Sequence, residues 1–228
     1  MYRYFIQPQL NKANQSLIGY ELLMKQHTSR GWQPPVSFSA LPAPVIADTL
    51  RQTAQKLVLK IGSVSVNLNR MQIHNHQIQT ALIDVQNELR PVRLVVELTE
   101  EPEEAPIAWA QLEPMIQRFV ERGIEISLDD VATGENKLSH IRPLLPYASE
   151  MKFALQNDAK LTLSDARMQQ RVRFWRDLAA EYHMRFILEG IESAADDRLV
   201  DALGIDLRQG YFYGKPQLLK LQASDPTN

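Results

Sequence analysis

Cysteine is absent from this 228-residue chain, and so is any long run of apolar residues. The lack of cysteine excludes a disulfide framework and metal sites built from thiolates, and it suits a reducing compartment. The lack of an apolar run of about 20 residues predicts that the chain carries no signal segment and does not enter a membrane. We therefore expect a cytoplasmic protein.

Neither sign of charge dominates the sequence. Lysine and arginine together number 25 and aspartate and glutamate 27, which gives a net charge of −2. This balance leaves no basic stripe for duplex nucleic acid and no polybasic segment for a membrane surface. We therefore expect a partner other than DNA, RNA duplexes or lipid.

The chain also lacks a linker and an internal repeat. No segment rich in proline, glycine and serine divides it into two parts. A chain of this length with an ordinary apolar content is long enough to bury one large core. We expect residues 1–228 to form a single domain.

Short apolar segments typical of strands alternate with segments of helical periodicity. The first two strands flank the turn 11–15, which predicts an antiparallel hairpin, and residues 27–44 predict an irregular segment. The expected strands are 2–7, 18–24, 64–68, 92–98, 124–128, 150–155, 185–189 and 207–212. The expected helices are 45–57, 71–88, one over 112–120, 138–145, one that Ser164 caps, and one from Ser193 to Ala202.

This alternation predicts an α/β protein with a parallel sheet covered by helices. About eight strands in a chain of this length favour a (β/α)8 TIM-like barrel, here with an antiparallel first strand. A doubly wound open sheet is the alternative, but the glycine-rich phosphate turn of that fold is missing after the first strand.

The apolar run 124–128 ends in two adjacent carboxylates, Asp129 and Asp130. Such a run predicts a buried strand whose acidic end faces a site. Two carboxylates this close repel each other by roughly 4 kcal/mol at an effective dielectric of about 20, so a buried pair shares a proton or binds a cation. The alternative is that one aspartate simply caps the next helix.

Polar side chains also stand at the ends of other predicted strands, namely Glu21, Asn67, Glu97 and Glu189. In a barrel these ends converge on the face where active sites of the fold lie. Carboxylates grouped there repel each other unless a cation neutralises them. Because the ligands are oxygens, we expect a hard cation, Mg²⁺ or Mn²⁺ before Zn²⁺.

Several short segments, in order, resemble one known family. They are Gln7-Pro8, Gly19-Tyr20-Glu21-Leu22-Leu23, Val66-Asn67-Leu68, Glu97-Leu98-Thr99-Glu100, Leu128-Asp129-Asp130, Lys152, Glu189-Gly190-Ile191-Glu192 and Gln209-Gly210-Tyr211. Over nearly the whole chain the sequence resembles the EAL-type cyclic di-GMP phosphodiesterases of bacteria. The Glu-Ala-Leu motif of that family is Glu21-Leu22-Leu23 here.

The resemblance implies hydrolysis of cyclic di-GMP to linear pGpG with two Mg²⁺ or Mn²⁺ ions per site. One ion would bind Glu21, Asn67, Glu97 and Asp129, and the other Asp129, Asp130 and Glu189. A water molecule would be the nucleophile, and the catalytic residues would be Lys152, Glu189 and Glu21. The substrate would contact Gln7, Lys25, Gln209 and Glu192, and Glu100 would brace the loop after Asp130.

The sequence departs from the family pattern at three points, of which the altered loop and Lys25 favour a second hypothesis. After Asp130 the family has Phe-Gly-Thr-Gly-Tyr-Ser-Ser, whereas residues 131–137 are Val-Ala-Thr-Gly-Glu-Asn-Lys. Ala132 replaces a glycine, so we expect another loop shape. Lys25 replaces an arginine, exchanging a bidentate fork for a point charge, and Ala154 replaces an acid. The second hypothesis is a catalytically weak or inactive EAL protein that acts as a receptor for cyclic di-GMP or as a regulator that binds a protein partner; a homodimer is also a candidate.

Overall fold

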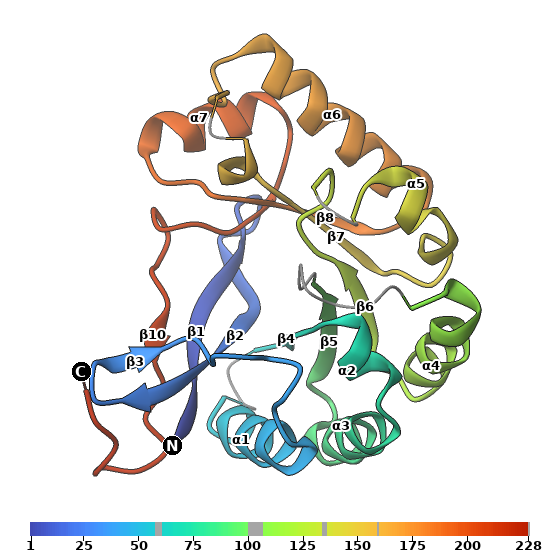
Figure 1. The fold of residues 1–228 in the computed structure, drawn as a ribbon. Coiled ribbons are helices and arrows are strands. Elements are labelled where there is room, and N and C mark those ends of the chain that lie inside the picture. Colours follow the sequence, from blue (N-terminus) through green and yellow to red (C-terminus); the bar gives the residue numbers. More distant parts are fainter. Residues whose placement is uncertain (58–60, 100–106, 134–135, 159, 228) are drawn as a thin grey trace.

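The computed structural model describes residues 1–57, 61–99, 107–133, 136–158 and 160–227. Its centre is a closed barrel (Figure 1), in which each strand pairs with its neighbour in the order β1, β2, β4, β5, β6, β7, β8, β9 and back to β1. The barrel strands are β1 (Tyr2–Asn11), β2 (Ser16–Thr28), β4 (Ser63–Leu68), β5 (Arg93–Leu98), β6 (Glu125–Leu128), β7 (Glu150–Ala154), β8 (Arg185–Glu189) and β9 (Leu207–Arg208).

Strand β1 pairs antiparallel with both β2 and β9, whereas the pairs from β2 through β9 are parallel. The predicted barrel with an antiparallel first strand is therefore confirmed. Parallel pairing from β2 onward directs the carboxyl ends of these strands to one end of the barrel.

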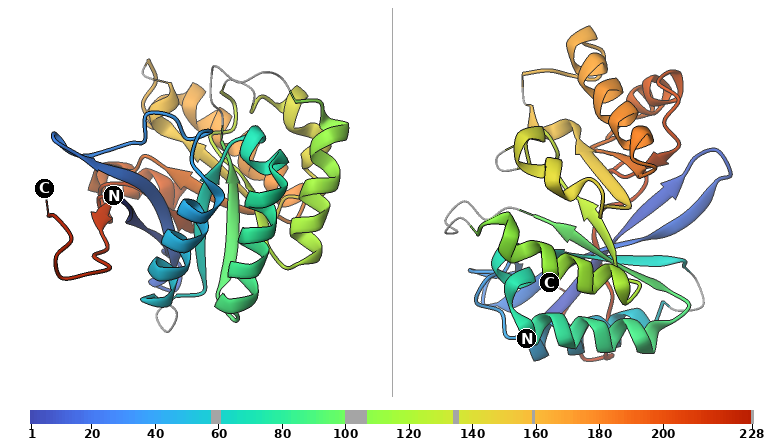
Figure 2. Two further views of the ribbon diagram at one scale, coloured as in Figure 1. Left: turned by 60° about the horizontal axis from the view of Figure 1, so that its bottom comes forward. Right: turned by 90° about the vertical axis from the view of Figure 1, so that its right-hand side faces the viewer.

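Helices surround the parallel strands, as the two further views in Figure 2 also show. They are α1 (Ala43–Gln55), the short α2 (Arg70–His74), α3 (His76–Leu89), α4 (Trp109–Glu121), α5 (Leu138–Ile141), α6 (Ala166–Glu181) and α7 (Ala194–Ala202). Helix α4 illustrates why they pack there: Leu112, Ile116 and Phe119 recur at helical spacing and are fully buried. Within the described ranges, no helix is long and apolar enough to cross a membrane.

Part of the segment predicted to be irregular continues the sheet. Strand β2 runs to Thr28 and pairs with β3 (Gly31–Gln33), so the prediction for residues 27–33 is wrong. Aromatic packing accounts for this extension, because the Trp32 ring lies edge-on to Phe5 at 5.8 Å and to His27 at 5.0 Å.

A further strand, β10 (Gln217–Leu218), pairs antiparallel with β1 along the edge of β1 that is opposite β2. Asp225 beyond it forms an ion pair of 2.6 Å with Arg3 of β1, and both side chains are largely buried. The last described residues therefore lie against the first strand (Figure 1).

Two predicted helices differ from the observed ones near their starts. The predicted helix 71–88 is divided, because the Asn75 side chain accepts hydrogen bonds from the amides of Gln77 and Ile78 and so starts α3. Ser164 caps no helix: α6 begins two residues later, and the hydroxyl of Ser164 instead contacts that of Thr162.

Two predicted elements are shorter than expected. The helix 138–145 is α-helical only to Ile141 and then becomes a 3₁₀ turn (Arg142–Leu144), since Pro143 has no amide hydrogen for an α-helical bond. The strand 207–212 ends at Arg208, because the chain turns away at Gly210 and the amide of Phe212 bonds the carbonyl of Ile191.

Candidate metal centre and active site

Four carboxylates surround the ammonium of Lys152 at the carboxyl end of the barrel. The Nζ atom lies 2.6 Å from Glu189, 2.9 Å from Glu97, 3.4 Å from Glu21 and 3.5 Å from Asp129. The Lys152 side chain is 1% exposed, although lysine is rarely buried unless it is paired. The structure thus brings together carboxylates from β2, β5 and β8 and from the residue that follows β6.

Two amides orient Glu21 within this group. Asn67 donates a hydrogen bond of 2.9 Å to Oε1 of Glu21, and Gln209 donates one to Oε2. Gln209 is held in place because Gly210 follows it: a Cβ atom on Gly210 would lie 2.1 Å from the carbonyl oxygen of Ile191, closer than any real contact. Glycine is therefore required for the turn that presents Gln209.

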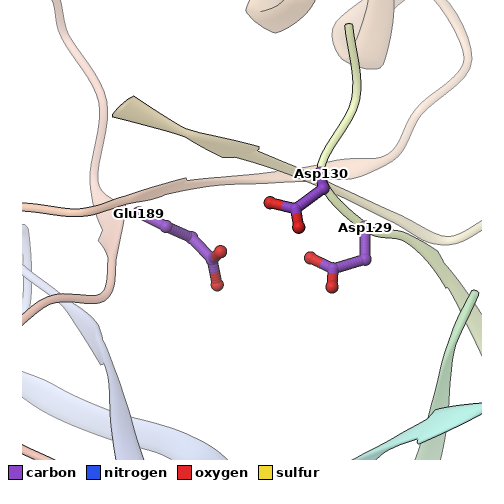
Figure 3. Close-up of side chains that lie close together, drawn as sticks. All are labelled: Asp129, Asp130 and Glu189. Carbon is purple, nitrogen blue, oxygen red and sulfur yellow. The ribbon is translucent and has the colours of Figure 1, made fainter. Parts of the chain in front are cut away.

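A second acidic group lies beside the first. Asp129, Asp130 and Glu189 each offer a carboxylate oxygen, and these oxygens lie within 4.8 Å of one another. Figure 3 shows the three carboxylates pointing into the same space, two from the end of β6 and one from β8. Neither aspartate caps a helix, since the next helix, α5, is preceded by Lys137.

Burial and mutual repulsion make three of the carboxyl groups around Lys152, those of Glu97, Asp129 and Glu189, hard to ionise. Burial, with the nearby carboxylates adding to it and Lys152 opposing it, raises the pKa of Asp129 to about 7 and that of Glu189 to about 8. The same causes raise the pKa of Glu97 well above its usual value. Burial would also raise the pKa of Glu21, but Lys152 and the amides of Asn67 and Gln209 lower it overall.

The donor set fits hard divalent cations. Oε1 of Glu97 is fully buried and has no hydrogen-bond partner among the described residues, and the same is true of Oε1 of Gln209. Oδ1 of Asp129 has only the Lys152 ammonium, at 3.5 Å. Buried carboxylate oxygens without donors are costly, and a cation would satisfy them. Carboxylate and amide oxygens are the ligands that Mg²⁺ and Mn²⁺ prefer.

A pocket of about 330 Å³ opens onto this centre. Its lining includes Gln7, Glu21, Asp129, Asp130, Gln156, Glu189, Glu192, Gln209 and Tyr211. A second pocket of about 380 Å³, lined mainly by apolar side chains, lies beside it and contains Lys25 and Asn67. Leu23 lines both pockets and therefore lies between them. The residues predicted to contact the substrate are divided between the two pockets: Gln7, Gln209 and Glu192 line the first, and Lys25 lines the second.

A family model described as the EAL domain matches residues 2–216. The chain belongs to the EAL domain family. Cyclic di-GMP phosphodiesterase PdeR of Escherichia coli K12 is 32% identical over 215 residues, which cover 86% of this chain and 31% of PdeR. The probable cyclic di-GMP phosphodiesterase PdeB of the same organism is 26% identical over 92% of this chain and 41% of PdeB. The chain thus spans less than half the length of these two curated relatives.

Solved EAL structures share the fold of this EAL domain. A PaMucR phosphodiesterase in complex with c-di-GMP has a TM-score of 0.75 at 22% identity, covering 94% of this chain and 96% of that one. A standalone EAL protein from Vibrio cholerae O395, in a c-di-GMP-bound form, has a TM-score of 0.75 at 18% identity, covering 95% and 92%. Both likenesses extend over nearly the whole barrel.

Two residues at the start of the loop after β6 have a left-handed backbone in this EAL domain. Ala132 has a φ of 79°, and Asp130 has a φ of 48°. The alanine was expected to change the loop shape by disfavouring this conformation, and the structure instead shows the alanine in it. Glu100, predicted to brace this loop, and residues 134–135 lie outside the described residues.

Sequence reasoning assigned no role to two amides that contact the aspartates. Asn157 donates a hydrogen bond of 2.8 Å to Oδ1 of Asp130. Asn136 donates one of 2.5 Å to the carbonyl of Asp129. The signal that identified Asn67, a polar residue directly after an apolar run, was available for neither, because Asn136 lies in a loop and Gln156 stands between Asn157 and the apolar run before it.

Proposed function

We propose that this EAL domain hydrolyses cyclic di-GMP to linear pGpG in a reaction that depends on divalent cations. The observation that carries the proposal is the grouping of four carboxylates around Lys152, one of them bonded to Asn67, at the end of the barrel where active sites of this fold lie. The names of PdeR and PdeB and the c-di-GMP complex of the MucR phosphodiesterase support the choice of substrate.

Two Mg²⁺ or Mn²⁺ ions would be held by the acids of the site. Glu21, Asn67, Glu97 and Asp129 would hold one, and Asp129, Asp130 and Glu189 the other. When bound, such cations lower the pKa of water and stabilise negative charge on phosphate oxygens. Oε1 of Glu97, which has no hydrogen-bond partner among the described residues, and Oδ1 of Asp129, which has only the Lys152 ammonium at 3.5 Å, support this assignment.

Lys152 would supply positive charge and hydrogen bonds to the reacting groups. Burial alone would lower its pKa, but Asp129, Glu189, Glu21 and Glu97 together raise the pKa well above its usual value. The side chain is therefore an ammonium that donates hydrogen bonds. In this role it would orient the attacking water and offset the charge that builds on the phosphate in the transition state.

The remaining residues would bind the dinucleotide and fix the ligands. Gln209 would keep Glu21 oriented while also facing the substrate, since it lines the pocket and donates to Glu21. Gln7 and Glu192 would contact the substrate in the first pocket, and Lys25 would contact a phosphate at the edge of the second.

A second candidate is a receptor that binds cyclic di-GMP without turning it over, alone, as a homodimer or with a protein partner. Two observations favour it. Ala132 holds a conformation that suits glycine, with a φ of 79°, next to the acidic pair. Lys25, which stands where the family has arginine, lies 4.4 Å from the centre of the Phe5 ring and offers a phosphate one point charge.

Titration calorimetry with Mn²⁺ tests the metal centre on which both the enzyme proposal and its mechanism depend. Asp129→Asn should weaken Mn²⁺ binding by at least about tenfold, because Asp129 would contact both ions. The matched control is Asp84→Asn, which changes an exposed aspartate on α3 and should bind Mn²⁺ as the wild type does. Equal affinities of wild type and Asp129→Asn would rule the centre out.

A further inference from the structure

One buried amide connects the ends of two strands that carry candidate ligands. Asn136 is 1% exposed, and its Nδ2 donates to the carbonyl of Asp129 at 2.5 Å and to that of Leu98 at 3.2 Å. Leu98 ends β5 directly after Glu97, and Asp129 directly follows β6. The amide therefore fixes the separation of the two backbones from which Glu97 and Asp129 project.

A second amide fixes the carboxylate of Asp130. Asn157 lies in the 3₁₀ turn after β7 (Leu155–Asn157), and its Nδ2 donates 2.8 Å to Oδ1 of Asp130. This bond holds one oxygen of the carboxylate and restrains its rotation about the side-chain bonds. In Figure 3 the Asp130 carboxylate points into the space shared with Asp129 and Glu189.

The backbone at this point needs such support. Asp130 and Ala132 both have positive φ, which costs free energy in residues other than glycine and persists only where neighbouring contacts enforce it. The amide of Val131 bonds the carbonyl of Lys152 at 3.1 Å, and the amide of Ala132 bonds the carbonyl of Asn136 at 3.0 Å. Asn136 thus holds the turn through its side chain and its backbone.

We propose that Asn136 and Asn157 are positioning residues that hold Asp129 and Asp130 in the arrangement that binds cations. Neither amide contacts the substrate in this account; each acts through an aspartate. The proposal rests on the proposed metal centre, and it adds two residues that lie outside the ligand set. Hydrogen-bonded partners of metal ligands typically change metal affinity by about 10–100-fold when they are removed.

Asn157→Ala gives the cleaner test, because Asn157 is exposed and its loss leaves the core intact. We expect Mn²⁺ affinity by calorimetry to fall about tenfold for the ion that Asp130 would contact, while the melting temperature of the cation-free protein stays within about 2 °C of the wild type. The matched control, Asn87→Ala, removes an exposed amide from α3 and should change neither quantity. An Asn157→Ala protein that binds Mn²⁺ as the wild type does overturns the role of Asn157.

Asn136 is tested by two variants compared with each other. Asn136→Ala removes both hydrogen bonds, whereas Asn136→Ser keeps a short donor beside the Asp129 carbonyl. We expect Mn²⁺ affinity to fall in the order wild type, Asn136→Ser, Asn136→Ala. If either variant fails to fold, the Asn157 result decides the proposal. If the wild type itself binds no Mn²⁺, the metal centre is wrong and this proposal fails with it; if the wild type binds and the asparagine variants match it, only the positioning roles are wrong.

Discussion

Lys152 donates a 2.9 Å hydrogen bond to Glu97, and both side chains are closed to solvent, at 1% and 0% exposure. A buried charge without its partner is strongly destabilising, typically by about 3–5 kcal/mol. The pair therefore links the charge balance of the site to the stability of the whole barrel, because β5 and β7, which carry these residues, are both barrel strands.

Replacing Lys152 by methionine should destabilise the cation-free protein. The side chain keeps its length but loses its charge, so the carboxylates around it lose their internal counter-ion. We expect the cation-free variant to unfold about 3–5 kcal/mol more easily than the wild type, and Mn²⁺ to restore more stability to it than to the wild type. Urea denaturation with and without Mn²⁺ measures both quantities.

The control for this experiment is Lys160→Met, which removes an exposed lysine. In the proposed reaction the Lys152 ammonium would act mainly in the transition state, so the same Lys152 variant should lower kcat by orders of magnitude and leave the affinity for cyclic di-GMP within a few-fold. A Lys152→Met enzyme with normal turnover contradicts the role given to this residue.

Cation binding should depend on pH in a defined direction. Asp129 and Glu189 have raised pKa values, about 7 and about 8, and must be ionised to bind a metal. Mn²⁺ affinity should therefore rise between about pH 6 and pH 9, with protons released on binding near pH 7 and few released near pH 9. Calorimetry in buffers of different ionisation enthalpy counts these protons.

The cation-free protein should lose stability over a related range. A carboxyl whose pKa is higher in the folded state than in the unfolded state keeps more protons when folded. The free energy of unfolding should therefore fall as pH rises from about 4 to about 8, and Asp129→Asn should reduce the slope. If the free energy of unfolding instead rises over this range, the pKa values of these carboxyl groups are not raised in the folded protein.

Ala132→Gly should relax the loop after the acidic pair. With a φ of 79°, alanine costs about 1–2 kcal/mol, which the larger entropy loss of glycine offsets in part. We expect stability to rise by up to about 1 kcal/mol. Thermal unfolding measures the change, and a loss of stability would mean that the alanine side chain contributes more than its strained backbone costs.

Lys25 should affect binding more than chemistry. It lines the second pocket beside Leu23, where it would contact a phosphate in the ground and transition states alike. Lys25→Ala should raise KM more than it lowers kcat, and Lys25→Arg should tighten binding because a planar fork forms two hydrogen bonds to a phosphate. Steady-state kinetics with cyclic di-GMP separates the two effects; a change in kcat alone would contradict this assignment.

The sequence predicted the barrel well because apolar runs and their order determine it. The run 124–128 and its neighbours alternate with helices such as α4, whose buried face follows the helical period. Element ends were less predictable, since they depend on single side chains. Asn75 divides a helix through its own hydrogen bonds, and Pro143 converts another into a 3₁₀ turn.

The candidate site could be predicted in part for a similar reason. Residues at strand ends, such as Glu97 and Asp129, follow from the register of the barrel. Asn136 and Asn157 could not be found, because their contacts with Asp129 and Asp130 come from a loop and a 3₁₀ turn, where the sequence carries no periodic pattern. The position of Ala132 was visible in the sequence, but its positive φ was not.

The most direct test of the central claim is hydrolysis of cyclic di-GMP by the purified protein with Mg²⁺ or Mn²⁺, followed by measurement of the linear product. We expect pGpG from the wild type and none from Asp129→Asn. If the wild type binds cyclic di-GMP yet forms no product with either cation, and Ala132→Gly does not restore turnover, the protein is a receptor and the proposed enzyme activity is wrong.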